Sequence, residues 1–125
     1  MVTIFLRVKI VKKGKNIGYE LFLRDTNGNS GNHTHKAIVD SGSKVAWELE
    51  KKSGIKDIAR IWVSDKNPAG KVFKTEPQRV GLRKIFIVDI VETRKELEDE
   101  YFITFVTDNG TVVSIDPFIR IPPPR

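Results

Sequence analysis

The sequence predicts an all-β domain built as a sandwich of two antiparallel sheets, and three observations point to it. Short stretches in which apolar and polar residues alternate recur along the whole chain, and a period of two residues is typical of half-buried strands. Gly, Asn, Asp, Ser and Pro separate these stretches, as turn residues do between strands. The length of 125 residues suits one core, and no repeat or linker divides the chain. Residues 1–125 are therefore predicted to form a single domain.

The N-terminal half contains five predicted strands. They cover residues 4–10, 19–23, 34–39, 44–50 and 58–64. A turn over residues 12–16 joins the first two strands, so we expect them to form a hairpin. In the fourth strand Val45, Trp47 and Leu49 point to one face, and Lys44, Ala46, Glu48 and Glu50 to the other, which predicts one buried face.

The C-terminal half begins with turn residues at 65–70 and a second break at 76–78, which leave at most an edge strand at 71–75. Further strands are predicted at residues 84–91, 101–107, 111–115 and 118–121. The Asn109-Gly110 step suits a tight type I′ turn between the second and third of these. Residues 93–100 contain Leu97 as their one apolar side chain, which favours a charged connection over a turn of helix.

The turn and strand at residues 39–49 resemble the V-x-x-G-x-x-V-x-W strand entry of cupredoxin-like domains, through Val39, Gly42, Val45 and Trp47. The chain is thereby similar to small bacterial cupredoxin-like β-sandwich proteins of uncharacterised function, and residues 53–58 and 101–121 add to the likeness. Immunoglobulin-like sandwiches share such a strand. The resemblance implies architecture and no copper, because a blue-copper centre needs a Cys thiolate with two His and the chain has no Cys.

The chain is basic, with 22 Lys and Arg against 16 Asp and Glu, a formal charge of +6. Such a charge favours nucleic acid or another polyanion when it is gathered on one face. Basic residues instead run from Arg7 to Arg125 with only short local clusters, so a solvated basic surface is the favoured interpretation. The absence of Cys excludes disulfides and thiolate chemistry.

The first ten residues lack the basic segment and apolar core of an export signal, which favours a cytoplasmic protein. An export signal removed from the chain stays open as the alternative. No apolar stretch approaches the roughly 18 residues of a membrane-spanning helix, so no insertion into a membrane is expected.

The only histidines, His33 and His35, are two residues apart, so on an extended segment both would face the same side. They are weak candidates for a metal site, because a closed site takes three or four protein ligands. Residues 25–31 begin like a calcium loop but place Ser30 and Lys36 where the EF-hand has Gly and Glu. We therefore predict two loop histidines, an Asn/Gly-rich turn and no cofactor.

Paired carboxylates are available at Glu48 and Glu50 and along residues 92–100. Acid–base chemistry needs such a pair in a cleft that separates the two pKa values. Nothing in the sequence places either group in a cleft, so a carboxylate-based hydrolase is the least favoured hypothesis.

In the fifth strand one face carries Ile58, Arg60 and Trp62, and the other carries Ala59, Ile61 and Val63. If the second set enters the core, Arg60 and Trp62 face outward, and an exposed aromatic beside Arg is typical of a binding anchor. With Lys44 of another strand, they are the predicted partner-binding residues. The leading hypothesis is a non-enzymatic binding module that meets a protein or an extended polymer on a sheet face. Binding of nucleic acid or another polyanion is the alternative, and the sequence leaves homo-oligomerisation open.

Overall fold

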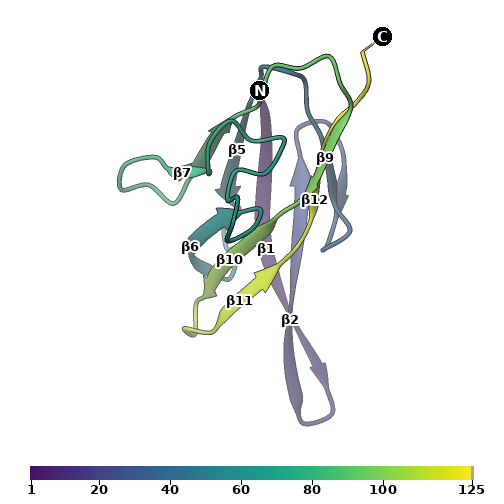
Figure 1. Ribbon diagram of the computed structural model, residues 1–125. Coiled ribbons are helices and arrows are strands. Elements are labelled where there is room, and N and C mark those ends of the chain that lie inside the picture. The colour runs from purple at the N-terminus through teal and green to yellow at the C-terminus, as the bar shows by residue number, and fades with distance from the viewer. Residues whose placement is uncertain (125) are drawn as a thin grey trace.

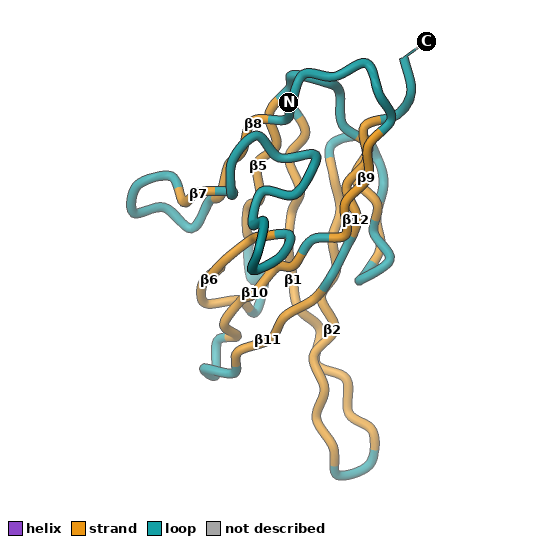
Figure 2. Tube along the Cα trace, viewed as in Figure 1, coloured by secondary structure: helices purple, strands orange, loops and turns teal. Residues whose placement is uncertain are grey.

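The computed structural model describes residues 1–124, and these residues form strands and loops with no helix (Figure 2). The first six strands are β1 (Val2–Lys13), β2 (Asn16–Asp25), β3 (Ser30–Gly31), β4 (Lys36–Ile38), β5 (Lys44–Leu49) and β6 (Ile55–Trp62). The remaining strands are β7 (Gln78–Arg79), β8 (Phe86–Asp89), β9 (Leu97–Glu100), β10 (Phe102–Thr107), β11 (Val112–Ile115) and β12 (Phe118–Ile121). The predicted all-β class is confirmed. Within the described range, no helix is long and apolar enough to cross a membrane.

The strands form three sheets (Figure 1). The largest has the order β3-β2-β1-β5-β8-β7, and the two smaller sheets have the orders β11-β10-β6 and β4-β12-β9. Side chains from all three sheets meet in one hydrophobic core, an arrangement consistent with a β-sandwich.

Two strand pairs are parallel, so the prediction of purely antiparallel sheets is wrong. β5 lies parallel to β1, with Val45 opposite Val2, and β4 lies parallel to β12. Parallel neighbours need a crossover connection, and here β2, β3 and β4 occupy the chain between β1 and β5. Alternation shows which side chains are buried but not the direction of the neighbouring strand, which is why the sequence did not reveal these pairs.

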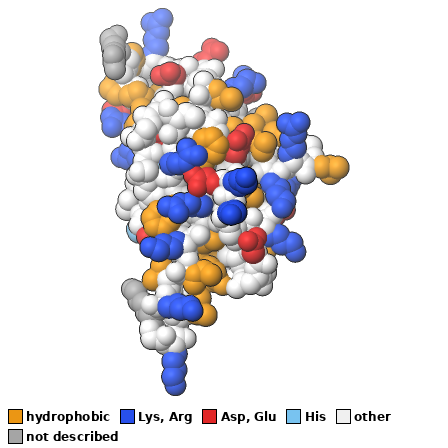
Figure 3. All heavy atoms as spheres, turned by 180° about the vertical axis from the view of Figure 1, so that it is seen from behind, with side chains coloured by type: hydrophobic (Ala, Val, Ile, Leu, Met, Phe, Trp, Pro, Cys, Tyr) orange, Lys and Arg blue, Asp and Glu red, His pale blue; other side chains and the backbone are white. Residues whose placement is uncertain are grey.

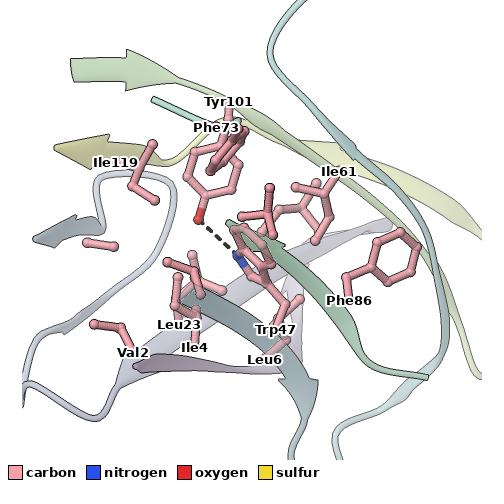
Figure 4. Close-up of a cluster of buried hydrophobic side chains, with 14 of the residues drawn as sticks. Val2, Ile4, Leu6, Leu23, Trp47, Ile61, Phe73, Phe86, Tyr101 and Ile119 are labelled. Atoms are coloured by element: carbon pink, nitrogen blue, oxygen red, sulfur yellow. Dashed lines mark hydrogen bonds between the residues drawn. The ribbon is translucent and has the colours of Figure 1, made fainter. Parts of the chain in front are cut away.

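Three aromatic rings occupy the centre of the core (Figure 4). The ring centroid of Trp47 lies 5.7 Å from that of Phe73 and 5.8 Å from that of Tyr101, in edge-to-face geometry. The indole Nε1 of Trp47 donates a hydrogen bond of 3.2 Å to the hydroxyl of Tyr101. Burial raises the pKa of the Tyr101 hydroxyl, which stays protonated. The β5 strand that resembles a cupredoxin-like entry thus supplies the central core residue.

Several predicted elements differ from those observed. Residues 71–75 form only an isolated bridge, between Phe73 and Ile90, and residues 97–100 of the predicted connection are strand β9. The hairpin between β10 and β11 is confirmed, but its turn is not type I′. That turn needs a positive φ at both central residues, and only Gly110 has one, at 89°.

The hairpin of β1 and β2 extends beyond the other strands (Figure 1). β5 pairs with β1 only as far as Leu6, and β3 pairs with β2 only at Leu23 and Arg24. The distal residues 9–18 therefore form a two-stranded projection, which we call the arm. Gly14, with a φ of 62°, lies in its tight turn.

The base of the arm is held by a turn from the body of the protein. The amide of Val8 donates a hydrogen bond of 2.7 Å to the carbonyl of Ser53. Gly54 has a φ of 76°, and a Cβ at this position would lie 2.7 Å from the Val8 side chain. Glycine is required at this close approach. On the other strand, the Tyr19 hydroxyl accepts a hydrogen bond of 2.6 Å from the side chain of Asn109.

Candidate binding surfaces

Arg60 and Trp62 are both partly exposed on β6, as expected if Ile61 enters the core, but the expected faces are wrong at Ile58, which is buried, and at Ala59, which is exposed. The register between β6 and β10 shifts between Arg60–Thr104 and Ile58–Phe105, which identifies a β-bulge around Ala59. The bulge explains why Ile58 and Ile61 are both fully buried although they are three residues apart. A strict period of two would have put Ile58 on the same face as Arg60.

Both predicted anchors are already engaged within the protein. The guanidinium carbon of Arg60 lies 4.8 Å from the Trp62 ring centroid, and the Trp62 ring stacks on Phe102 at 5.3 Å. Arg60 donates two hydrogen bonds to Glu76, 2.9 Å from Nη2 and 3.3 Å from Nε, and these bonds raise the pKa of the guanidinium. The Arg60 fork thus attaches the segment containing Glu76 to the sheet.

Lys44 lies apart from these two residues. It is on β5 of the six-stranded sheet, whereas Arg60 and Trp62 are on β6 of another sheet. Its Nζ is 3.3 Å from a carboxylate oxygen of Asp89 on the neighbouring strand β8. Since Val45 and Trp47 point into the core, Lys44 faces outward from its own sheet. The structure brings Arg60 and Trp62 together but not Lys44.

The two histidines do not face the same side, so that expectation is wrong. His35 is buried, and its Nε2 lies 2.9 Å from Oδ2 of Asp25, while His33 is exposed. The segment is not extended, because the His35 amide donates to the carbonyl of Asn32 across a turn. The described residues contain no group of three or more His, Asp or Glu side chains placed to hold a metal ion.

Asp25 also organises the segment that begins like a calcium loop. Its Oδ1 accepts hydrogen bonds from the amides of Asn27 and Asn29, at 2.9 and 3.1 Å. Asp25 is itself buried, so its carboxylate serves a turn and a histidine inside the protein. The predicted Asn/Gly-rich turn is confirmed.

Sequence reasoning did not single out the arm as a surface. Its ten residues contain four lysines and no acidic residue, which is four of the six net positive charges of the chain, and Glu20, opposite Lys9, is the acidic residue at its base. The lysines are Lys9, Lys12, Lys13 and Lys15. Among the side chains that the structure describes, none forms an ion pair with Lys9, Lys12 or Lys15. The far face of the molecule shows basic side chains along this projection (Figure 3).

Basic residues on the body of the protein are different, because many of them are neutralised by carboxylates. The ion pairs of the described Lys and Arg residues are Arg7 and Arg24 with Glu50, Lys36 with Glu98, Lys44 with Asp89, Arg60 with Glu76 and Asp65, Arg79 with Asp57, and Arg120 with Glu96. The arm thus carries one of the short basic clusters that the sequence shows, and further exposed lysines, such as Lys66 and Lys74, lie on the body.

The arm also exposes apolar side chains. Ile10 is 55% exposed and Ile17 is 60% exposed, although both belong to regular strands. Beside them an open groove of about 520 Å³ follows the outer edge of β2. It is lined by Val11, Asn16, Ile17, Gly18, Tyr19, Glu20 and His33. Exposed apolar residues with polar neighbours are typical of an interaction surface.

No sequence signal marks the arm, because the full lengths of its strands are known only from the structure. The first two strands have 12 and 10 residues, whereas the other described strands have 8 or fewer. Strands that are longer than their neighbours project beyond the sheet, and the lysines are in the projecting part. The alternation of residues 4–10 was correctly interpreted as a strand, but nothing local shows where its neighbours end.

The fold and these surfaces define an all-β protein with a basic, partly apolar arm. No protein-family model matches the chain, and no curated protein matches it. The resemblance to cupredoxin-like domains is tested by neither comparison.

Proposed function

We propose that this protein is a non-enzymatic binding module that holds an acidic segment of a partner protein on its arm. The observation that supports this function most strongly is the gathering of four of the six net charges on ten projecting residues. Complementary charge raises association rates and selects partners. Exposed Ile10 and Ile17 add apolar contact area beside the lysines.

The arrangement of the lysines supports a role in binding rather than in stability. Like charges close together on a two-stranded ribbon destabilise it, and no ion pair within the described chain offsets Lys12 or Lys15. An acidic partner would remove that repulsion when it binds. The Ser53–Gly54 turn and the Tyr19–Asn109 hydrogen bond hold the base of the arm, so binding does not have to order it.

Charge reversal on the arm is the direct test. We expect Lys12→Glu/Lys15→Glu to weaken binding of a fluorescent decapeptide of alternating Val and Glu by about tenfold or more, since each exposed charge contact contributes roughly 0.2–1 kcal/mol and reversal adds repulsion. Fluorescence anisotropy at about 50 mM and about 200 mM salt should show weaker binding at the higher salt.

The matched control is Lys66→Glu/Lys74→Glu, which makes the same change in net charge at two exposed lysines outside the arm. We expect this variant to bind the peptide within about threefold of the wild type, because screening weakens charges beyond about 10 Å. Equal losses in the two variants would show that net charge, not the arm, attracts the peptide.

Nucleic-acid binding through the same arm is the second candidate. The specific observation in its favour is that the arm has lysines on both faces of the ribbon. Lys12 is on the face of β1 whose residues enter the core nearer the body, and Lys9 is on the opposite face. A single-stranded oligonucleotide is its probe. Tighter binding of the oligonucleotide than of the acidic peptide, with a steep dependence on salt, would replace the protein partner with a polyanion.

We also propose that the sandwich is of the cupredoxin-like kind without a copper site. The supporting observation is that residues 39–49 form the expected turn and strand, with a φ of 72° at Gly42 and a fully buried Trp47. Arg60 and Trp62 stay a second proposed contact surface, on the outer face of β6.

A further inference from the structure

The direction of the backbone groups on β2 follows from hydrogen bonds at the base of the arm. The Val8 amide donates to Ser53, and the Leu6 carbonyl accepts from the amide of Glu50. Even-numbered residues of β1 therefore turn their backbone groups away from β2, and odd-numbered residues turn theirs toward it. The tight turn agrees, since Lys13 and Asn16 close it as a pair.

The same alternation applies to β2 with the opposite parity. Val11 is opposite Gly18 and Lys9 is opposite Glu20, so Gly18 and Glu20 turn their backbone groups toward β1. Ile17 and Tyr19 then direct their amides and carbonyls to the other edge. Near the body, Leu23 uses this edge to pair with Gly31 of β3. Within the described chain, no backbone group of another segment forms a hydrogen bond with the amides or carbonyls of Ile17 and Tyr19 at this edge.

This edge has room for another chain. The open groove follows it, in line with the end of β3 and beside His33. Gly18 leaves part of that groove empty without being required there: its φ is not positive, and an added Cβ would meet only the Val11 carbonyl oxygen, at 3.7 Å. A partner side chain can occupy the space next to Val11 that a larger residue at position 18 would fill.

We propose that the acidic partner segment adds as an extended strand to the edge of β2 at Ile17 and Tyr19. This inference rests on the proposed function and specifies how the arm recognises its partner. Backbone hydrogen bonds to the edge would provide affinity, and alternate side chains would provide specificity. Carboxylates on the added strand would face Lys12 and Lys15 at the distal end of the arm.

The charge of the arm argues for this occupant over two others. A second copy of the chain would bring another four lysines against the first four, and lysines on edge strands oppose self-pairing. A nucleic acid can neutralise the lysines, but it has no peptide backbone to continue a β-ladder. An extended acidic peptide satisfies both the cations and the backbone groups of the edge.

The test measures amide hydrogen exchange by NMR in the full chain saturated with the Val/Glu decapeptide. We expect exchange of the Ile17 and Tyr19 amides to slow by tenfold or more, because a ladder hydrogen bond protects them. The amides of Gly18 and Glu20 already bond to β1 and should change less. Unchanged exchange at Ile17 and Tyr19 in the saturated complex would overturn strand addition.

A modified probe separates this inference from the proposed function. We expect the decapeptide to lose at least tenfold in affinity when alternate residues are N-methylated, since the donors of one edge are removed while the charge is kept. Equal affinities would refute strand addition and leave an arm that binds acidic peptides by charge. If neither peptide binds, the proposed function is wrong as well.

Protein variants give an independent check. Ile17→Pro removes an amide that faces the edge and is not bonded to β1, as prolines on natural edge strands do, and Ile17→Thr keeps that amide as the matched control. Gly18→Val fills the groove without a positive φ to strain it. We expect Ile17→Pro and Gly18→Val to weaken peptide binding at least fivefold, and Ile17→Thr less than twofold. Full affinity in Gly18→Val and Ile17→Pro would overturn the proposal.

Discussion

At the scale of single residues, several polar groups inside this protein have specific partners, while His35 Nδ1 and Arg120 Nε are buried without a hydrogen bond. The Trp47 indole is bonded to the Tyr101 hydroxyl, and buried Asp25 is bonded to His35 and to two backbone amides. A buried polar group without a partner is costly, so these contacts help to select one packing of the core. The same rule applies to Asp99, whose buried carboxylate accepts hydrogen bonds from the amides of Lys71 and Val72.

Removing the Tyr101 hydroxyl tests the value of one such contact. In Tyr101→Phe the Trp47 Nε1 loses its partner in a fully buried site, so we expect the free energy of unfolding to fall by about 1–3 kcal/mol. Urea denaturation followed by circular dichroism measures the change. Tyr19→Phe, which makes the same chemical change at a partly exposed hydroxyl, should cost less than about 1 kcal/mol; equal losses would show that burial is not what matters.

At the scale of elements, strand edges decide what the sheets can bind. Arg79 of β7 covers the outer edge of β6. Its Nη2 donates a hydrogen bond of 2.7 Å to the Ile58 carbonyl, and its Nη1 and Nη2 donate hydrogen bonds of 2.8 and 3.1 Å to the Asp57 carboxylate. The edge of β2 along the arm has no such cover in the described chain. This difference is why we place strand addition at β2 rather than at β6.

The Asp57–Arg79 pair gives a prediction about pH. The hydrogen bonds from Arg79 hold the pKa of Asp57 below its ordinary value in the folded protein. The pair therefore stabilises the fold above the unfolded pKa of about 3.9, and this contribution is lost as the pH falls through the lower folded pKa. We expect Asp57→Asn to be less stable than the wild type at pH 7 and to lose less stability on acidification. Because both side chains are partly exposed, the effect should be small.

Thermal unfolding of both proteins between pH 7 and pH 2 measures this effect. Asp65→Asn is the control, because the Asp65 carboxylate is almost fully exposed and its contact with Arg60 is long, at 4.0 Å. Parallel stability curves for Asp57→Asn and the wild type would contradict the assignment of the acid-sensitive contact to this pair.

At the scale of the whole molecule, the two candidate surfaces belong to different parts of the fold. The arm is an extension of the six-stranded sheet, and Arg60 and Trp62 are on the outer face of β6 in another sheet. Ion pairs hold some cations of the body, such as Arg60 and Arg79, whereas the ten residues of the arm contain four lysines and no carboxylate, so the arm is the surface that we expect an acidic partner to meet. We therefore expect changes in the two surfaces to act independently.

Trp62→Ala tests that independence. The ring packs on Phe102 and beside Arg60, so we expect its loss to reduce stability by about 1–3 kcal/mol. Binding of the Val/Glu decapeptide should stay within about twofold of the wild type, as measured by anisotropy on the folded variant. A loss as large as that of the Lys12/Lys15 variant would move the contact to the outer face of β6.

The sequence by itself determined the all-β class, most strand positions and many of the inward residues. Alternation with a period of two is a local property, and it correctly identified Val45 and Trp47 as buried and Arg60 and Trp62 as facing outward. Only the tertiary structure decided the parallel pairs, the bulge at Ala59, the burial of His35 and the separation of Lys44 from Arg60.

The arm depends both on features that the sequence shows and on features that only the tertiary structure shows. Its lysines and its alternation are visible in the chain, but its role as a projection depends on β5 and β3 ending before β1 and β2 do. Charge becomes a surface property only when neighbouring strands are known, because neighbours supply the carboxylates that neutralise it or leave it exposed. Within the described residues, the same pairing leaves the backbone groups of Ile17 and Tyr19 without a hydrogen bond, which no local pattern could show.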